Sequence, residues 1–147
     1  MDPNAERKNW MSLLAKAPSG VLAGLWANYG AQPGFDWLRP PEIGGAMVRG
    51  RMGGTGAAFN LGEMTVTRCS LRLTDGPVGH AYVQGRDKDK ARIAALVDAL
   101  MQGPGAADVR AAILTPLADQ IQARRNARAA KAAATKVEFF TMVRGED

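Results

Sequence analysis

Two helical stripes of apolar residues occupy the N-terminal part of the chain. Asp2 and Pro3 form a favourable N-cap and first-turn pair for the first helix, and Pro18 separates it from the second. The apolar positions recur at intervals of three and four at Trp10, Leu13, Leu14 and Ala17, and again at Leu22, Leu25, Trp26 and Tyr29. The pattern therefore predicts helices near residues 3–17 and 20–29, which form a short helical hairpin.

After residue 34 the apolar residues alternate with polar ones, which is typical of strands. The predicted strands lie near residues 35–38, 46–52, 64–73 and 77–84. Pro40 and Pro41 are expected to end the first of these, and the Thr-Asp-Gly turn at residues 74–76 joins the last two as an antiparallel hairpin. The apolar phase shifts between Val66 and Cys69, which predicts a bulge there or a sheet covered on both faces.

The C-terminal half returns to helical spacing and then ends in an alternating run. Asp87 is a favourable cap for a helix near residues 88–102, and further helices are predicted near residues 107–114 and 116–134. Residues 136–144 carry apolar side chains at both odd and even positions. A strand with two apolar faces is predicted to lie inside the sheet. The expected fold class is α+β, an antiparallel sheet covered by helices, in a single domain over residues 1–147.

The amino-acid composition excludes some classes of metal site and indicates where the protein is located. One histidine and one cysteine cannot supply a structural zinc site or an iron–sulfur cluster within this chain. The lone Cys69 cannot form an internal disulfide, and neither a signal-peptide pattern nor a membrane-spanning apolar run is present, so a cytoplasmic location is expected. The net charge of +5 equals the charge of residues 120–136, which contain five basic side chains and no acidic one.

A glycine-rich loop, Gly53-Gly54-Thr55-Gly56, lies between two arginines, Arg51 and Arg68. It lacks the Lys-Ser/Thr pair of a P-loop, and its antiparallel surroundings do not fit a Rossmann unit. Exposed backbone N–H groups beside guanidinium groups suit an anion, but glycines also permit tight turns, and the sequence is compatible with both.

Three further features have two interpretations each. Arg86 beside a helix N-terminus suits a phosphate group, although Asp87 is equally explained as a helix cap. His80 lies in mid-strand, and histidine is a common general acid or base, but a lone histidine is more often packed than catalytic. Arg124, Arg128 and Lys131 share one helix face; without interleaved aromatic residues, a solvated or partner-facing stripe is favoured over nucleic-acid binding.

Five motifs, in this order and at these separations, resemble those of one known family. They are RMGGTG at residues 51–56, FNLGE at 59–63, VTRC at 66–69, YVQGRDK at 82–88 and FFTMVRG at 139–145. The family is the G subunit of the bacterial carbon–phosphorus lyase core complex, a subunit of α-D-ribose 1-methylphosphonate 5-triphosphate synthase. The resemblance implies a transferase complex in phosphonate catabolism that replaces the adenine of ATP with an alkylphosphonate.

The resemblance also implies partners and a division of labour. The partners are the H, I and J subunits, with the L subunit for the synthase step; ATP is a substrate of the complex, and this chain alone binds no cofactor or metal. We expect an accessory, architectural subunit whose isolated chain is not catalytic, without nucleic-acid or membrane partners. The alternatives are a stand-alone nucleotide or phosphate-ester enzyme that uses the glycine–arginine loop, and a basic nucleic-acid-binding module.

No catalytic residue is assigned by the sequence. The candidates for contact with an anion or a partner are Arg51, Gly53, Gly54, Gly56, Arg68 and Arg86, with His80 as a weaker candidate.

Overall fold

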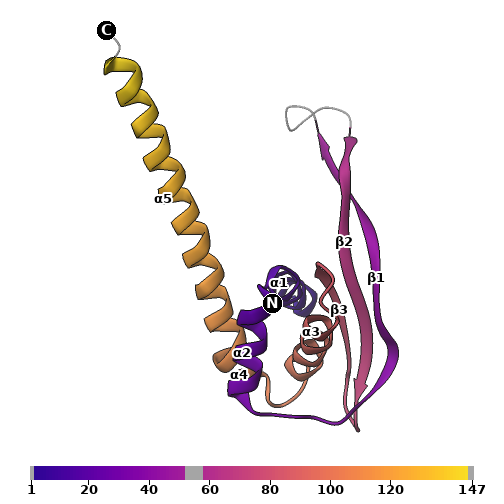
Figure 1. The fold of residues 1–147 in the computed structure, drawn as a ribbon. Helices are drawn as coiled ribbons and strands as arrows, with labels where there is room; N and C mark the ends of the chain where they lie inside the picture. The colour runs from indigo at the N-terminus through magenta and orange to yellow at the C-terminus, as the bar shows by residue number, and fades with distance from the viewer. Residues whose placement is uncertain (1, 52–57, 146–147) are drawn as a thin grey trace.

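The computed structural model describes residues 2–51 and 58–145, which form one antiparallel sheet with helices on one of its faces (Figure 1). The strands are β1 (Phe35–Arg51), β2 (Ala58–Leu73) and β3 (Val78–Gln84), in the order β1-β2-β3. The helices are α1 (Pro3–Lys16), α2 (Ser19–Tyr29), α3 (Lys88–Met101), α4 (Ala106–Val109) and α5 (Thr115–Gly145), and a π-helical turn, η2 (Arg110–Leu114), joins the last two. The predicted α+β class is confirmed.

The molecule has three layers (Figure 1). α3 and α1 pack against one face of the sheet, and α2 packs on α3 together with η2 and the beginning of α5. We call the face that packs on α3 the inner face and the opposite one the outer face. None of the helices in the described part of the chain is both long and apolar enough to span a bilayer.

The N-terminal helices and the hairpin form where the local sequence predicts them. The Asp2 side chain accepts a hydrogen bond from the backbone N–H of Asn4, and Gly30 ends α2 in the left-handed region with φ 77°. β2 and β3 pair in regular antiparallel register from Val66↔Gln84 to Arg72↔Val78. The turn between them contains Asp75 at φ 53°, a conformation that aspartate tolerates well.

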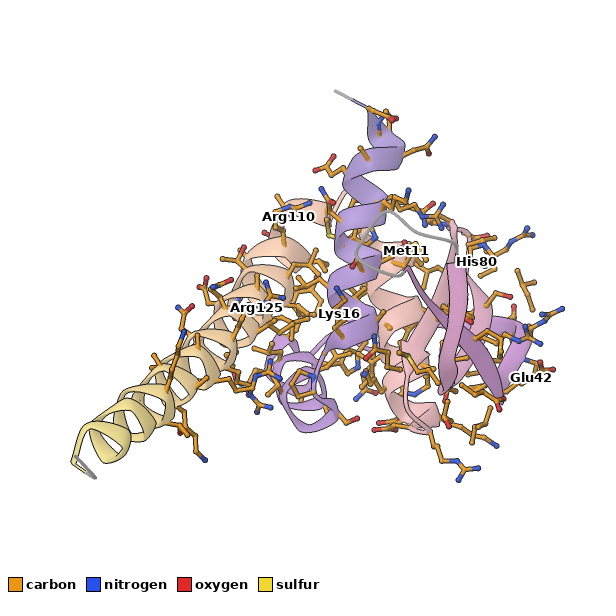
Figure 2. The ribbon with its side chains drawn as sticks, turned by 90° about the horizontal axis from the view of Figure 1, so that it is seen from above. Met11, Lys16, Glu42, His80, Arg110 and Arg125 are labelled. Carbon is orange, nitrogen blue, oxygen red and sulfur yellow. The ribbon has the colours of Figure 1, made fainter. Side chains whose placement is uncertain are left out.

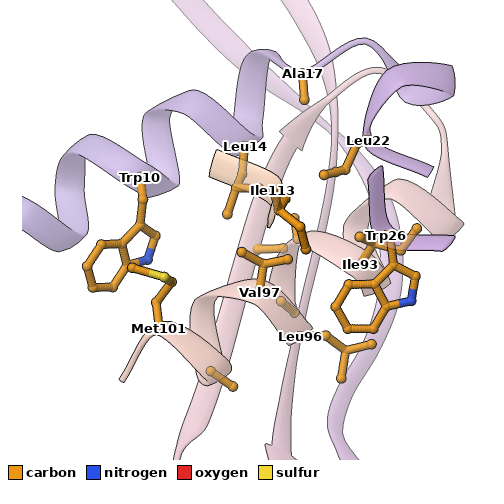
Figure 3. Close-up of a cluster of buried hydrophobic side chains, with 14 of the residues drawn as sticks. Trp10, Leu14, Ala17, Leu22, Trp26, Ile93, Leu96, Val97, Met101 and Ile113 are labelled. Atoms are coloured by element: carbon orange, nitrogen blue, oxygen red, sulfur yellow. The ribbon is translucent and has the colours of Figure 1, made fainter. Parts of the chain in front are cut away.

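The core lies between the inner face of the sheet and the helices (Figure 3). Cys69, Leu71 and Leu73 of β2 are buried, as are Ala81 and Val83 of β3. Figure 3 shows the cluster that α1, α2 and α3 contribute, with Ile113 at its centre. Its labelled members are Trp10, Leu14, Ala17, Leu22, Trp26, Ile93, Leu96, Val97, Met101 and Ile113. Burial alternates along β3, because its odd-numbered residues face this core and its even-numbered residues face away from it.

The two strands predicted near residues 35–38 and 46–52 are one continuous strand, so this expectation was wrong. β1 runs through Pro40 and Pro41, and the pairing with β2 shifts between Trp37 and Arg39 and again between Arg39 and Glu42. Proline lacks the N–H of a regular ladder, but β1 is an edge strand and bulges leave residues unpaired. The prolines therefore bend the strand without ending it.

The irregularity expected between Val66 and Cys69 lies in the partner strand. β2 keeps regular register with β3 through this stretch, while β1 has an extra residue opposite Cys69. Val66 and Thr67 are adjacent and both buried, which explains the shift of apolar phase in the sequence.

The strand predicted near residues 136–144 is wrong: these residues are helical and belong to α5. Phe139, Met142 and Val143 are spaced by three and four, so the same run also fits a helix. The run directly follows an alanine-rich helix. Because adding residues to an existing helix is easier than starting a new one, the helix continues through residues 136–144.

The helices predicted near residues 107–114 and 116–134 form one continuous helical segment. α4 passes through η2 into α5, although Pro116 lies at the second position of α5. A proline in a helix lacks one N–H and clashes with the preceding turn. The wider π turn directly before Pro116 is the local irregularity at which such a residue is accommodated.

Candidate functional site

Four of the predicted site residues lie outside the residues that the structure describes or directly beside that gap. Gly53, Gly54 and Gly56 fall outside the described residues, and Arg51 is the last residue of β1, paired with Ala58. The hypothesis of an anion-binding glycine loop therefore stays a prediction.

Asp87 is the N-cap of α3. Its carboxylate accepts hydrogen bonds of 3.0 Å from the backbone N–H groups of Asp89 and Lys90. The bond from Lys90 is the main reason that the pKa of Asp87 is lowered; desolvation, the next largest effect, opposes it, and Ser19, Asp89 and the Lys90 charge contribute less to the lowering. Arg86 is exposed beside this cap, so its role as a phosphate contact stays a prediction.

Arg68 and His80, by contrast, line one hollow on the sheet. Its volume is about 510 Å³, and its polar walls come from all three strands: Arg39 of β1, Arg68 and Ser70 of β2, and His80 and Tyr82 of β3. Met11 of α1 and Leu38 of β1 supply apolar walls. Figure 2 shows Met11 beside His80, and Glu42 on the outer side of the sheet, away from the helices.

The strand register explains why these residues meet. Arg39, Ser70 and His80 are direct neighbours across the three strands, and the next row is Glu42, Arg68 and Tyr82. Direct cross-strand neighbours have Cβ atoms about 4.5–5.5 Å apart on the same face. Two polar rows therefore lie side by side on the outer face.

The bulges in β1 are what bring Arg39 to this face. Trp37 pairs with the buried Leu71, so in a regular strand residue 39 would face the core as well. The extra residue between Trp37 and Arg39 reverses that parity, so that Arg39 pairs with Ser70 on the outer face. Sequence reasoning missed Arg39; the Arg-Pro-Pro run was the signal for a bulge.

Arg68 has one weak partner in this site. Its Nε lies 3.6 Å from a carboxylate oxygen of Glu42, and both side chains are more than half exposed. An exposed ion pair at this distance contributes about 0–1 kcal/mol. The guanidinium of Arg68 is thus accessible to a competing anion.

The backbone of His80 belongs to a second, buried network that the sequence did not indicate. The Asp98 carboxylate on α3 is fully buried and accepts hydrogen bonds from four donors. The donors are Arg7 Nε (3.1 Å), Arg7 Nη2 (2.8 Å), Trp10 Nε1 (2.8 Å) and the His80 backbone N–H (2.9 Å). Asp98 thereby joins α1 and α3 to the edge strand β3, directly behind the polar rows, and its bond to Arg7 raises the pKa of that guanidinium.

The basic stripe of α5 borders another hollow. Arg124 and Arg128 line a space of about 530 Å³ together with Lys16 of α1 and the apolar Pro18 and Ile121. From residue 122 to residue 136 every side chain of α5 is exposed. The stripe is therefore exposed in this chain, and its role stays a prediction.

A metal site has no support in this part of the chain. Within residues 2–51 and 58–145, no three His, Cys, Asp or Glu side chains are grouped closely enough to hold an ion. Cys69 is buried, its Sγ lies 3.3 Å from the carbonyl oxygen of Ala91, and desolvation raises the pKa of its thiol to about 11. It is a packed core residue.

Comparison with known proteins covers nearly the whole chain. The profile of the family described as "Phosphonate metabolism protein PhnG" matches residues 5–145. A protein of Rhizobium meliloti (strain 1021) named "Alpha-D-ribose 1-methylphosphonate 5-triphosphate synthase subunit PhnG" is 45% identical over 143 residues, which are 97% of this chain and 92% of that protein. Both matches extend over nearly the whole chain, which therefore belongs to the PhnG family of phosphonate metabolism proteins.

Proposed function

We propose that this chain is a subunit of an α-D-ribose 1-methylphosphonate 5-triphosphate synthase, in which an alkylphosphonate replaces the adenine of ATP. The proposal rests on the 45% identity to a protein that carries this subunit name. We further propose that the chain is accessory: it shapes the assembly with the H, I and J subunits, and the L subunit joins for the synthase step.

The shape of the molecule is the observation that supports an accessory role. Two arms project from the core in Figure 1: the β1–β2 ribbon beyond the end of β3, and α5 beyond its first turns. A two-stranded ribbon and an isolated helix are each only marginally stable in water on their own. Such arms are typical of subunits that gain further contacts in an assembly.

The β1–β2 ribbon also exposes apolar side chains. On β1, Ile43 is 41% and Met47 is 57% exposed; Ile43 pairs with Thr67, and Met47 pairs with Glu63, beyond the part of β2 that pairs with β3. Exposed apolar groups of this kind mark interaction surfaces when they are contiguous. Ile43 and Met47 are therefore our candidates for direct contact with a partner subunit.

The chemistry of the described residues agrees with this division of labour. Displacement of adenine from ribose needs an acid for the leaving base and negative charge beside the oxocarbenium-like carbon. The acids on the outer face, Asp36 and Glu42, lie on an open sheet beside arginines, not in an enclosed pair. We therefore assign the bond-making groups to the partner subunits.

The test is co-expression of this chain with its H, I and J partners, followed by affinity purification and size exclusion. We expect one complex that contains this chain, and loss of synthase activity when the chain is omitted. Ile43→Asp and Met47→Asp together should reduce its recovery in the complex, because a charge is placed in an apolar contact. Asn28→Asp, which makes the same charge change as each of the two substitutions on an exposed position of α2, is the control and should assemble normally.

Two results would contradict the proposal. One is assembly and full activity of the partners without this chain. The other is replacement of adenine on ATP by methylphosphonate with the purified chain alone, which would favour a stand-alone nucleotide enzyme.

A further inference from the structure

We propose that the outer face of the sheet carries a binding site for a tetrahedral phosphorus oxyanion, a phosphate or phosphonate group, held by Arg39, Arg68 and His80. The site is the hollow of about 510 Å³ described above. Small-molecule sites commonly have volumes of about 300–1,000 Å³.

The three donors come from three adjacent strands, so the backbone ladder fixes their spacing. Arg39 and His80 flank Ser70 in one row, and Arg68 lies in the next row on the central strand. An oxyanion above Ser70 therefore has the Arg39 guanidinium on one side and the His80 imidazole on the other, with the Arg68 guanidinium and the Ser70 hydroxyl within side-chain reach. Guanidinium groups bind phosphate-type oxygens through paired, charge-assisted hydrogen bonds.

The bulge in β1 is a second, independent indication. It interrupts the ladder and turns an arginine away from the inner face, where a regular strand would direct it. Bulges are over-represented beside functional sites because they re-aim side chains in this way. Here the interruption places Arg39 beside Ser70, so that the outer face has a second guanidinium near that of Arg68.

Local charge leaves room for an anion. Arg68 is held only by the exposed Glu42 at 3.6 Å, and Arg39 forms no ion pair with any other described residue. A dianion carries more charge than Glu42 and can engage both guanidinium groups, so it would displace Glu42 from Arg68. Glu42 thereby acts as an internal competitor for the site.

The walls of the hollow indicate what accompanies the anion. Leu38, 54% exposed, and Met11 of α1 lie beside the cationic groups. An apolar wall next to a phosphate-type site suits a short organic substituent on the phosphorus atom or its ester oxygen. We therefore expect an organic phosphonate or phosphate ester to bind more tightly than inorganic phosphate.

The test uses the full chain without partners, so that its failure and the failure of the proposed function are distinguishable. Inorganic phosphate, ethylphosphonate and ATP are titrated separately by calorimetry at constant ionic strength. We expect binding of at least one of them, weakened about tenfold or more by Arg39→Gln and by Arg68→Gln, because each removes a charge-assisted hydrogen bond. Glu42→Gln should tighten binding, since it removes the competitor.

Arg72→Gln is the matched control. Arg72 lies on the same strand and the same face, but it does not line the hollow. It should change the affinity less than about twofold, and the melting temperatures of all variants should agree, because these arginines are exposed.

The competing ligands identify the source of the anion. Tighter binding of ethylphosphonate than of inorganic phosphate supports the apolar wall, and tighter binding of ATP assigns the site to a nucleotide phosphate. The proposal is overturned if none of the three binds at millimolar concentration, or if Arg72→Gln weakens binding as much as Arg68→Gln.

Discussion

Asp98 is the residue on which the packing of α1, α3 and β3 most depends. Its carboxylate is fully buried and accepts four hydrogen bonds, two from Arg7 and one each from Trp10 and His80. A buried charge is tolerated only where its partners are complete. Its removal also leaves donors without an acceptor, which costs more than the bonds themselves are worth.

We predict that Asp98→Ala lowers the free energy of unfolding by about 3–5 kcal/mol. The Trp10 N–H and the His80 backbone N–H would lose their acceptor in a buried setting. Urea unfolding followed by tryptophan fluorescence measures the change. Asp89→Ala is the control: its ion pair with Arg92 is exposed, so a loss below about 1 kcal/mol is expected. Equal losses in the two variants would contradict the importance of the buried network.

The burial of Cys69 can be tested through the reactivity of its thiol. Desolvation raises the pKa of its thiol to about 11, from an ordinary value of 9.0. The thiolate is the reactive form, so at pH 8 its population falls about a hundredfold relative to an unshifted thiol. We predict very slow reaction with Ellman's reagent in the folded chain and fast reaction in guanidinium chloride. Comparable rates in the two conditions would show that the thiol is accessible.

Asp87 stabilises α3 in a way that depends on pH. Hydrogen bonds from backbone N–H groups lower its pKa in the folded chain below the ordinary value of 3.8. The charged cap therefore contributes fully above that value, and its contribution is lost as the pH falls through the lower, folded pKa. We predict that the stability difference between the wild type and Asp87→Asn is largest at neutral pH and disappears in acid. A difference that stays constant from pH 7 to pH 2 would contradict this.

At the scale of elements, the closest contact between sheet and helix occurs at Gly79. A Cβ at this position would overlap the carbonyl oxygen of Ala95 and lie 2.9 Å from Cβ of Ala99. The backbone of an α-helix cannot give way as a flexible side chain can. The glycine is thus what allows α3 to approach β3, and with it the Asp98 network to form.

We predict that Gly79→Ala destabilises the chain by about 1–3 kcal/mol, the usual cost of overpacking. The matched control is Gly24→Ala in α2, where a Cβ meets nothing within 4 Å. That change should stabilise the chain by about 0.5–1 kcal/mol, because alanine favours a helix. Thermal unfolding of both variants is the measurement, and shifts of the same sign would contradict the assignment.

Local signals predicted some elements and failed for others. The hairpin of β2 and β3 and the caps at Asp2 and Asp87 followed from turn and capping chemistry that acts within a few residues. Residues 136–144 were assigned wrongly because their apolar positions fit both periods, and the sequence could not reveal whether a neighbouring strand was available.

The candidate site was only partly accessible from the sequence for the same reason. Arg68 and His80 were identified by residue type, but their meeting depends on the register between strands. Arg39 was missed because its direction depends on a bulge, and Asp98 because its four donors lie far away along the chain. Arg51 and the glycine loop stay predictions of the sequence.

At the scale of the whole molecule, a folded core is separate from its arms. Up to residue 136, the last buried residue of α5 is Leu117, and residues 122–136 are exposed. Trp10 and Trp26 lie in the core, so their fluorescence reports on the core and not on the helical arm. The two parts can therefore be perturbed and observed separately.

We predict that the triple change Ala127→Gly, Ala130→Gly and Ala133→Gly reduces helical circular dichroism without shifting the urea transition seen by tryptophan fluorescence. Each glycine disfavours the helix by about 1 kcal/mol, and all three positions are exposed. Leu117→Ala, on the same helix but fully buried, is the control and should cost about 2–5 kcal/mol. A shift of the tryptophan transition by the triple change would mean that the arm supports the core.

Without such a shift, weaker recovery of the triple variant with the partner subunits would assign the arm to assembly, because only its helical order has changed.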